Sequence, residues 1–146
     1  MGVFREVHTG NWERVPLLVY KEEGTHFRSI TRQTLFSGDQ SLPAQLRYFE
    51  IAPGGHSTLE RHEHLHSVMI LRGRGAALVE GSIEELAPHD LVEIPPMSWH
   101  QFRATQGEPF GFLCLVSSER DRPRRPDSRE LALLQSDPRV NAFIRT

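Results

Sequence analysis

Short apolar runs separated by turn-forming residues make up most of this chain. From residue 45 onward the runs are rich in β-branched and aromatic side chains, and Gly73, Gly75, Gly81, Pro88 and Gly107 interrupt them. Short strands with regular turn signals and no helical pattern between them are typical of an antiparallel sandwich or barrel. We therefore expect an all-β fold with strands at 45–51, 67–73, 75–81, 83–88, 90–96, 99–104 and 110–117.

Two further strand-like segments precede this region. Residues 15–21 are apolar and rich in β-forming side chains, whereas residues 27–36 alternate in a way that leaves their buried face ambiguous. Residues 37–43 have the composition of a loop. We expect residues 1–45 to form N-terminal strands and a loop that pack on the barrel or on a partner subunit.

The character of the chain changes after residue 118. Residues 119–129 are rich in arginine and proline with interleaved acids, which favours a solvated linker over a phosphate- or nucleic-acid-binding arm. Asp127 or Ser128 can cap a short helix, and Asp137–Pro138 can start a second one. We therefore assign residues 46–118 to the barrel core, and residues 119–146 to a linker and C-terminal helices.

Composition excludes several classes of protein. A chain of 146 residues suggests a single domain, and its net charge of −2 argues against general nucleic-acid binding. The apolar runs are too short to span a membrane, and the first residues lack the apolar segment of a signal peptide. Cys114 is the single cysteine, so no internal disulfide forms, and its apolar neighbours predict a buried side chain. We expect a cytoplasmic protein.

The densest group of ionisable side chains lies between Ala52 and Gly75. Four of them share the same parity along the chain: Glu60, His62, His64 and His66. Alternate residues of a strand point to one face, and in a small barrel one face is the interior. Burying imidazoles and a carboxylate without partners would cost several kcal/mol, and a divalent cation removes that cost. The pattern therefore predicts a metal site, which His100 from a second segment would complete.

The spacing in this segment resembles the first cupin motif: Gly, five residues, His-x-His, three or four residues, Glu, six residues, Gly. The corresponding positions are occupied here by Gly54, Glu60, His62, His66 and Gly73. Glu60 thus stands in place of the first motif histidine, and His66 in place of the motif glutamate. The ligand positions keep metal-binding side chains in an altered order.

A second segment resembles the other cupin motif: Gly, five residues, Pro-x-Gly, two residues, His, three residues, Asn. Its positions are occupied here by His89, Pro95, Met97, His100 and Ala104. The resemblance covers roughly residues 46–116. It implies a single-domain cupin, that is, a double-stranded β-helix or jelly-roll barrel, with short helices following it. In cupins such N-terminal strands often pair with a second subunit, so we expect a homodimer.

Carried over position by position, the resemblance implies one divalent transition metal ion (Mn, Fe, Co, Ni or Zn) bound by Glu60, His62, His66 and His100. Two alternatives stay open. His64 joins the ligands instead of Glu60 if the segment is one unbroken strand. Gln101 replaces Glu60 if a bend after Trp99 turns the amide inward.

Such a ligand set leaves coordination positions open, which is the mark of a catalytic metal. We expect Glu60 and His64 to move protons. Residues that share the ligand parity, together with two aromatic neighbours, should form the pocket wall: Tyr48, Val68, Ile70, Ile94, Phe102 and Phe112. An apolar cup with a metal at one end suits a small organic substrate.

The resemblance leaves two functions open. The first is a metal-dependent enzyme acting on a carbonyl, enol or aromatic compound, as in cupin dioxygenases, isomerases and polyketide cyclases. The second is a non-enzymatic module that senses a metal or a small ligand. Fold-level analogy does not choose the substrate.

Overall fold

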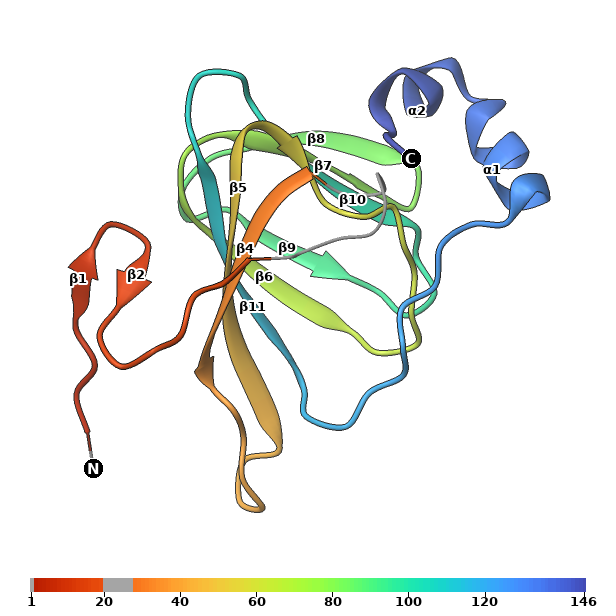
Figure 1. The fold of residues 1–146 in the computed structure, drawn as a ribbon. Coiled ribbons are helices and arrows are strands. Elements are labelled where there is room, and N and C mark those ends of the chain that lie inside the picture. Colours follow the sequence, from red (N-terminus) through yellow and green to blue (C-terminus); the bar gives the residue numbers. More distant parts are fainter. Residues whose placement is uncertain (1, 20–27) are drawn as a thin grey trace.

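The computed structural model describes residues 2–19 and 28–146 and has an all-β architecture followed by two short helices (Figure 1). The predicted fold class is confirmed. The strands and helices are β1 (Glu6–His8), β2 (Asn11–Trp12), β3 (Leu18–Val19), β4 (Arg28–Phe36), β5 (Ala44–His56), β6 (His66–Arg72), β7 (Gly75–Val79), β8 (Ser82–Leu86), β9 (Leu91–Ile94), β10 (His100–Ala104), β11 (Phe110–Ser117), α1 (Ser128–Gln135) and α2 (Pro138–Phe143).

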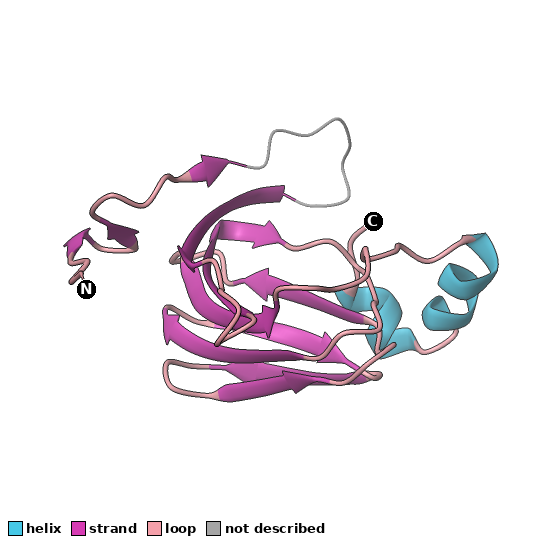
Figure 2. Ribbon diagram, turned by 90° about the horizontal axis from the view of Figure 1, so that it is seen from below, coloured by secondary structure: helices cyan, strands magenta, loops and turns pink. Residues whose placement is uncertain are grey.

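One antiparallel sheet in the order β8-β7-β10-β5-β11-β6-β9 forms the body, and β4 adds to it beside β5. The sheet curls so that its inner face closes around the core, with both helices at one side (Figure 2). Strand β5 is the longest, and it pairs with β4, β10 and β11. Because β5 and β11 exchange bonds from Ala44 to Ile51, inward side chains of the two strands stand opposite one another.

Two apolar clusters stabilise this arrangement. The larger cluster fills the barrel and includes Ile51, Ile70, Ile94 and Phe110, which are all inaccessible to solvent. A smaller one joins the barrel to the C-terminal helices through Leu59, Leu78, Val140, Phe143 and Ile144. Burial of such side chains contributes roughly 1.5–3 kcal/mol each. The helices therefore fix one end of the barrel.

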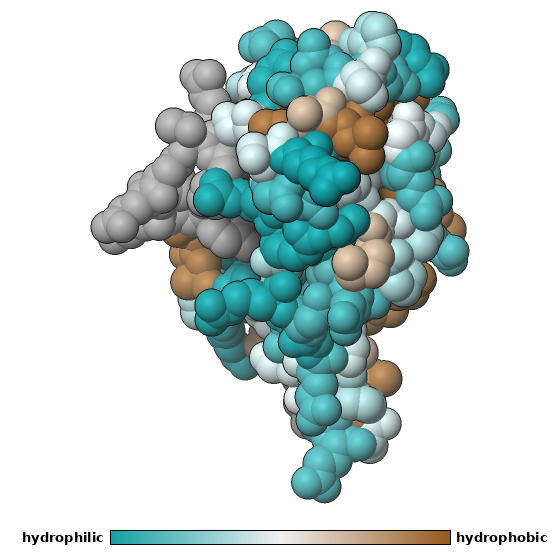
Figure 3. All heavy atoms as spheres, turned by 90° about the vertical axis from the view of Figure 1, so that its right-hand side faces the viewer, coloured by the Kyte–Doolittle hydropathy of each residue, from teal (hydrophilic) through white to brown (hydrophobic). Residues whose placement is uncertain are grey.

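Capping residues start both helices where the sequence predicts. Asp127 accepts a hydrogen bond from the Glu130 backbone N–H, and the Glu130 side chain accepts one from the Asp127 backbone, which completes a capping box. Asp137 caps α2, with Pro138 in its first turn. The side of the molecule that carries these helices is largely hydrophilic (Figure 3).

The N-terminal hairpin of β1 and β2 packs on the outer face of the sheet. The Trp12 ring contacts Tyr48 edge-on at 5.0 Å between centroids. The Gln33 side chain donates to the Gly10 carbonyl and accepts from the Trp12 backbone N–H. Of the two expected N-terminal strands, 27–36 corresponds to β4, whereas 15–21 contains only the short strand β3; residues 20–27 of these segments lie outside the described part of the chain.

None of the helices in the described residues has the length and hydrophobicity needed to cross a membrane.

Candidate metal centre

Backbone pairing brings the two histidine-bearing segments together. Glu60 and His100 form an antiparallel bridge in which each backbone N–H donates to the other residue's carbonyl, at 3.2 and 3.0 Å. His62 follows in the turn that leads to β6, and His66 is the first residue of β6. Residues far apart in the sequence thus meet at one end of the barrel.

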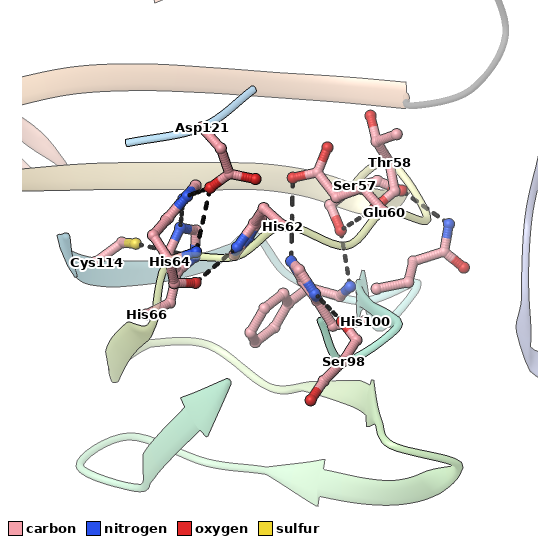
Figure 4. Close-up of polar contacts among 12 residues, drawn as sticks. Ser57, Thr58, Glu60, His62, His64, His66, Ser98, His100, Cys114 and Asp121 are labelled. Carbon is pink, nitrogen blue, oxygen red and sulfur yellow. Dashed lines mark hydrogen bonds and ion pairs between the residues drawn. The ribbon is translucent and has the colours of Figure 1, made fainter. Parts of the chain in front are cut away.

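Three imidazoles converge there (Figure 4). Metal-binding nitrogens of His62, His66 and His100 all lie within 4.8 Å of one another. A first-row ion bound by imidazole lies about 2.0–2.1 Å from each nitrogen, so nitrogens this close can share one ion. The structure brings together three of the four residues expected as ligands.

Hydrogen bonds to backbone carbonyls set the tautomers of two of these histidines. His62 Nδ1 donates to the His64 carbonyl at 2.7 Å, and His100 Nδ1 donates to the Ser98 carbonyl at 2.9 Å. Because Nδ1 carries the proton, Nε2 presents a lone pair. His62 Nε2 is buried and has no hydrogen-bond partner among the described residues. An orphaned lone pair facing two other imidazoles fits a metal ion.

Burial keeps these imidazoles neutral, as metal binding requires. It lowers the pKa of His62, lowers that of His100 to about 4 and lowers that of His66 to about 2. The neighbouring histidines add to the effect, because positive charges this close repel one another. Protons therefore compete weakly for the site near neutral pH.

His64 lies beside the three convergent histidines, and Asp121 holds it there. Its ring stacks on His62 with centroids 3.8 Å apart, and its Nδ1 lies 2.6 Å from Asp121 Oδ1. The other ring nitrogen of His64, Nε2, lies 3.0 Å from His66 Nε2. His64 thus faces the three convergent histidines.

Glu60 approaches the cluster without joining it. Its Oε1 lies 4.0 Å from His100 Nε2. Burial raises the pKa of the Glu60 carboxyl to about 7, and the charge of Arg47 opposes that rise. The carboxyl thus lies beside the histidines with a pKa above that of an ordinary glutamate.

Gln101 points away from the site. Its side chain is fully buried, and its Nε2 donates to the carbonyls of Ser57 and Arg145 at 2.8 and 2.7 Å. Its Oε1 accepts from the Arg145 backbone N–H at 2.9 Å. Two of these bonds tie the C-terminal end of the chain to the barrel, and the third joins the amide to Ser57. Gln101 is therefore engaged away from the histidines, and the bend that would turn its amide inward is not seen.

A cavity of about 420 Å³ opens onto the histidines. Its lining residues are Ile30, Arg32, Arg47, Phe49, Ser57, Thr58, Glu60, His64, His66, Val68, His100, Phe102, Phe112, Cys114, Arg120 and Pro123. Three of the expected wall residues, Val68, Phe102 and Phe112, are among them. The size and apolar walls are typical of a small-molecule site.

The other three expected wall residues lie elsewhere. Ile70 and Ile94 are inaccessible members of the barrel core. Tyr48 points to the outer face, where its hydroxyl donates to Glu50 and its ring meets Trp12. On β5 the alternate residues, Arg47 and Phe49, face the cavity instead. Alternation in the sequence identifies these two faces but does not decide which one is inside, because each face carries a charged residue.

Sequence reasoning missed four polar residues near the histidines: Arg32, Arg47, Arg120 and Asp121. It also treated Cys114 as a buried apolar side chain. Cys114 is indeed buried, but its Sγ lies 3.6 Å from His66 Nδ1 and 3.6 Å from an Arg47 nitrogen. The register between β11 and β5 explains the contact with Arg47, because Cys114 lies directly opposite Arg47.

Comparison with known proteins shows to which family the chain belongs. A family model described as a cupin domain matches residues 47–116. A curated protein of Rhodospirillum rubrum, 1-methylthio-D-xylulose 5-phosphate methylsulfurylase, is 58% identical over 134 residues, covering 91% of this chain and 85% of its own. The chain is a cupin. The family predicted from the motif spacing is thereby confirmed.

Solved cupin structures share the whole architecture. A cupin-2 domain from Rhodospirillum rubrum is 58% identical, with a TM-score of 0.87 over 91% of this chain and 89% of its own. A cupin 2 conserved barrel domain protein from Rhodopseudomonas palustris is 47% identical, with a TM-score of 0.95 over 99% of this cupin and all of the other chain. The N-terminal strands and C-terminal helices therefore belong to the shared fold.

Proposed function

We propose that this cupin is a metal-dependent enzyme that removes the methylthio group from a methylthio-substituted ketose phosphate such as 1-methylthio-D-xylulose 5-phosphate. One observation carries the proposal: a histidine cluster suited to a metal ion and a cysteine thiol share one cavity, with Cys114 Sγ 3.6 Å from His66 Nδ1. The 58% identical relative is named for methylsulfur chemistry on this sugar phosphate.

The resident ion in this proposal is one divalent transition metal from the group Mn, Fe, Co, Ni and Zn. His62, His66 and His100 would hold it, with Glu60 or His64 beside them. Such an ion supplies Lewis-acid polarisation of a carbonyl oxygen. In the named sugar phosphate the methylthio-bearing carbon is next to a ketone, so this polarisation would act where the carbon–sulfur bond must break.

Cys114 is the acceptor of the methylthio group in this proposal. Its Sγ forms a sulfur–sulfur bond with the methylthio sulfur, and the bond between that sulfur and C1 of the sugar breaks. The electron pair of the broken bond goes to C1, which the adjacent carbonyl stabilises, and C1 gains the proton that the thiol loses. The products are a methyl disulfide on Cys114 and a 1-deoxy-ketose phosphate.

A second thiol completes the cycle. A low-molecular-weight thiol attacks the methyl disulfide, departs as the mixed methyl disulfide and leaves Cys114 as the free thiol. Glu60 and His64 are the groups that carry protons between thiol, carbon and solvent. Glu60 suits this task because its pKa is raised to about 7, and His64 because Asp121 fixes which nitrogen faces the site.

The test is direct. Metal-loaded protein is incubated with 1-methylthio-D-xylulose 5-phosphate and a small thiol, and products are followed by NMR and mass spectrometry. We expect one methyl disulfide per 1-deoxy-ketose phosphate. Without the small thiol, intact protein mass should increase by one methylthio group in place of the thiol hydrogen. Substrate that binds but returns unchanged with all five metals would favour a non-enzymatic binding module instead.

Cys114→Ser separates this chemistry from the metal site. The variant should keep the metal content and melting temperature of the parent, and lose at least a hundredfold in turnover. Turnover that survives the substitution would remove Cys114 from the reaction and leave only the metal in it.

We also propose that the protein works as a cytoplasmic homodimer. A reactive free thiol is maintained in a reducing compartment. The N-terminal segment exposes apolar side chains at Val3, Phe4, Val7 and Val19, each more than half exposed. Such a patch suits a second copy of the chain. Light scattering during size-exclusion chromatography gives the mass, and a monomer would contradict the dimer.

A further inference from the structure

A cluster of charged and aromatic side chains lies next to the metal-site histidines in the sequence but outside their cavity. We call it the Trp99 clamp, and its members are Arg61, Trp99, Arg124 and Glu130. None of the four is among the described residues that line the cavity. Arg61 immediately precedes His62, and Trp99 immediately precedes His100. The clamp therefore joins the two segments that provide these histidines.

The backbone register places Arg61 opposite Trp99. Glu60 and His100 form the antiparallel bridge, so the residues next to them also stand opposite one another. The guanidinium carbon of Arg61 lies 4.4 Å from the centre of the Trp99 ring, which is a cation–π contact. Adjacent residues of extended backbone point to opposite faces, so this contact fixes the spacing of the two segments from the side away from the imidazoles.

Arg124 contacts the same ring and brings in the segment after β11. Its guanidinium carbon lies 5.4 Å from the centre of the Trp99 ring, and its backbone exchanges two hydrogen bonds of 3.0 Å with Arg61. Glu130 on α1 accepts from Arg61 Nη2 at 2.7 Å, and from Arg124 Nη1 and Nη2 at 2.8 and 2.7 Å. One carboxylate thus bridges two guanidinium groups that both contact one indole ring.

The segment between β11 and α1 also reaches the site itself. Asp121 contacts His64, and Arg120 and Pro123 line the cavity. Arg124 directly follows Pro123, so its contacts with the clamp also fix where this segment crosses the cavity.

We propose that the Trp99 clamp positions His62 and His100 at the separation that a shared metal ion requires. Its members act through the backbone of the two histidine-bearing segments and do not touch the ion. Groups that orient metal ligands from outside commonly change metal affinity or activity about ten- to a hundredfold when they are replaced. The clamp rests on the metal site of the proposed function, to which it adds the residues that maintain the geometry.

The test compares metal affinity with stability. Trp99→Leu removes the ring that both arginines contact, whereas Trp99→Phe keeps an aromatic face. Competition with a chromophoric chelator measures the dissociation constant for Zn²⁺ at a temperature where each variant is folded. Lower stability alone does not change this constant, because the binding-competent state remains the dominant one.

We expect the dissociation constant for Zn²⁺ to rise about tenfold in Trp99→Leu and to recover at least in part in Trp99→Phe. A constant in Trp99→Leu equal to that of the parent would overturn the proposal.

Phe143→Leu is the matched control. Phe143 is another ring in contact with an arginine, with the Arg103 guanidinium carbon 5.0 Å from its centre. It belongs to the apolar cluster that joins the helices to the barrel and is not among the described cavity residues. Its replacement should lower the free energy of unfolding and leave the affinity for Zn²⁺ unchanged. An equal rise of the dissociation constant in both leucine variants would overturn the clamp, because any loss of packing would then weaken the site.

Glu130→Gln tests the ionic part of the clamp. Glutamine keeps an acceptor for the Asp127 backbone N–H, so the capping box of α1 is retained while the charge that pairs with both arginines is lost. The dissociation constant for Zn²⁺ should lie between those of the parent and Trp99→Leu, and the difference from the parent should shrink at high salt. An unchanged constant at low salt would contradict the part assigned to Glu130.

The outcome is separable from that of the proposed function. The expected order of Zn²⁺ affinities without methylthio transfer would keep the clamp and reject the reaction. Methylthio transfer with equal Zn²⁺ affinities would keep the reaction and reject the clamp.

Imidazole NMR decides in the case of a parent protein that binds no Zn²⁺. His62 and His100 each donate from Nδ1 to a backbone carbonyl, which gives one defined tautomer. Nitrogen-15 spectra should show these tautomers in the parent and in Phe143→Leu, and mixed tautomers in Trp99→Leu. Defined tautomers that persist in Trp99→Leu would overturn the clamp.

Discussion

Asp121 Oδ1 lies 2.6 Å from His64 Nδ1, and the same carboxylate accepts the backbone N–H groups of Glu63 and His64 at 2.8 and 3.1 Å. The segment after β11 thus holds the turn that carries the metal-site histidines. These bonds also keep the Asp121 carboxylate ionised, lowering its pKa to about 2. A fixed carboxylate orients the imidazole so that Nε2 faces the site, as outer partners of metal-site histidines commonly do.

Replacing Asp121 should therefore impair function more than it impairs metal binding. We expect Asp121→Ala to keep close to the metal content of the parent protein while turnover falls about ten- to a hundredfold. Its effect is on His64, so Asp121→Asn, which keeps one acceptor oxygen, should recover part of the lost rate. Elemental analysis and steady-state kinetics check both variants. Metal loss from Asp121→Ala as complete as from a ligand substitution would show that Asp121 holds the metal site itself.

The three convergent histidines should account for metal binding. His62→Ala and His100→Ala are each expected to strip most of the metal from purified protein, because each removes one of three convergent imidazole nitrogens. His64→Ala should retain it. Elemental analysis after dialysis measures the metal per chain. Full metal occupancy in both His62→Ala and His100→Ala would refute the site. A loss of metal from His64→Ala equal to that from His62→Ala would show that His64 is a ligand.

Much of this architecture could be predicted from the sequence, because turn residues and short apolar runs report local structure. The motif spacing also carries long-range information, since it places His62 and His100 on adjoining segments before any contact is seen. Burial of clustered imidazoles is costly unless a metal ion or another partner contacts them. Hence the pattern predicted the barrel and the convergence of His62, His66 and His100.

Asp121 could not be predicted in the same way. Its segment is charged and proline-rich, which in a sequence is indistinguishable from a solvated linker. In the structure the segment crosses the site, where Arg61 and Arg124 exchange two backbone hydrogen bonds of 3.0 Å. Which part of the barrel a linker crosses depends on tertiary packing, such as the apolar cluster that fixes α2, and not on local periodicity.

Acid should destabilise the metal-free protein through its buried histidines. The pKa of His100 is about 4 in the folded protein, against 6.5 for an unperturbed imidazole. Between these values the unfolded chain binds a proton that the folded protein does not, so the free energy of unfolding decreases as the pH falls from about 6.5 to about 4. Above pH 6.5 this group adds no pH dependence.

The variant His100→Gln isolates that effect. Glu60 acts in the opposite sense, because the folded protein binds its proton more readily than the unfolded chain, but Glu60 is present in both proteins. Urea titrations of chelator-treated samples at about pH 7.5 and about pH 5 should show a larger loss of stability for the parent than for His100→Gln. Equal losses would mean that His100 is accessible to protons in the folded state.

Gln101 should matter for the fold and not for the metal. Its buried amide makes three hydrogen bonds, two of them with the Arg145 backbone, which close the C-terminal end of the chain against the barrel. Gln101→Leu puts an apolar side chain of similar size in place of the amide and leaves partly buried backbone groups without these partners, which costs about 1–3 kcal/mol. We expect a lower free energy of unfolding and earlier proteolysis after α2, with unchanged metal content.

Gln135→Leu on the exposed end of α1 is the matched control, and its free energy of unfolding should lie within about 0.5 kcal/mol of that of the parent. Metal loss specific to Gln101→Leu would instead place this amide among the ligands, and an unchanged free energy of unfolding would show that the C-terminal end does not depend on it.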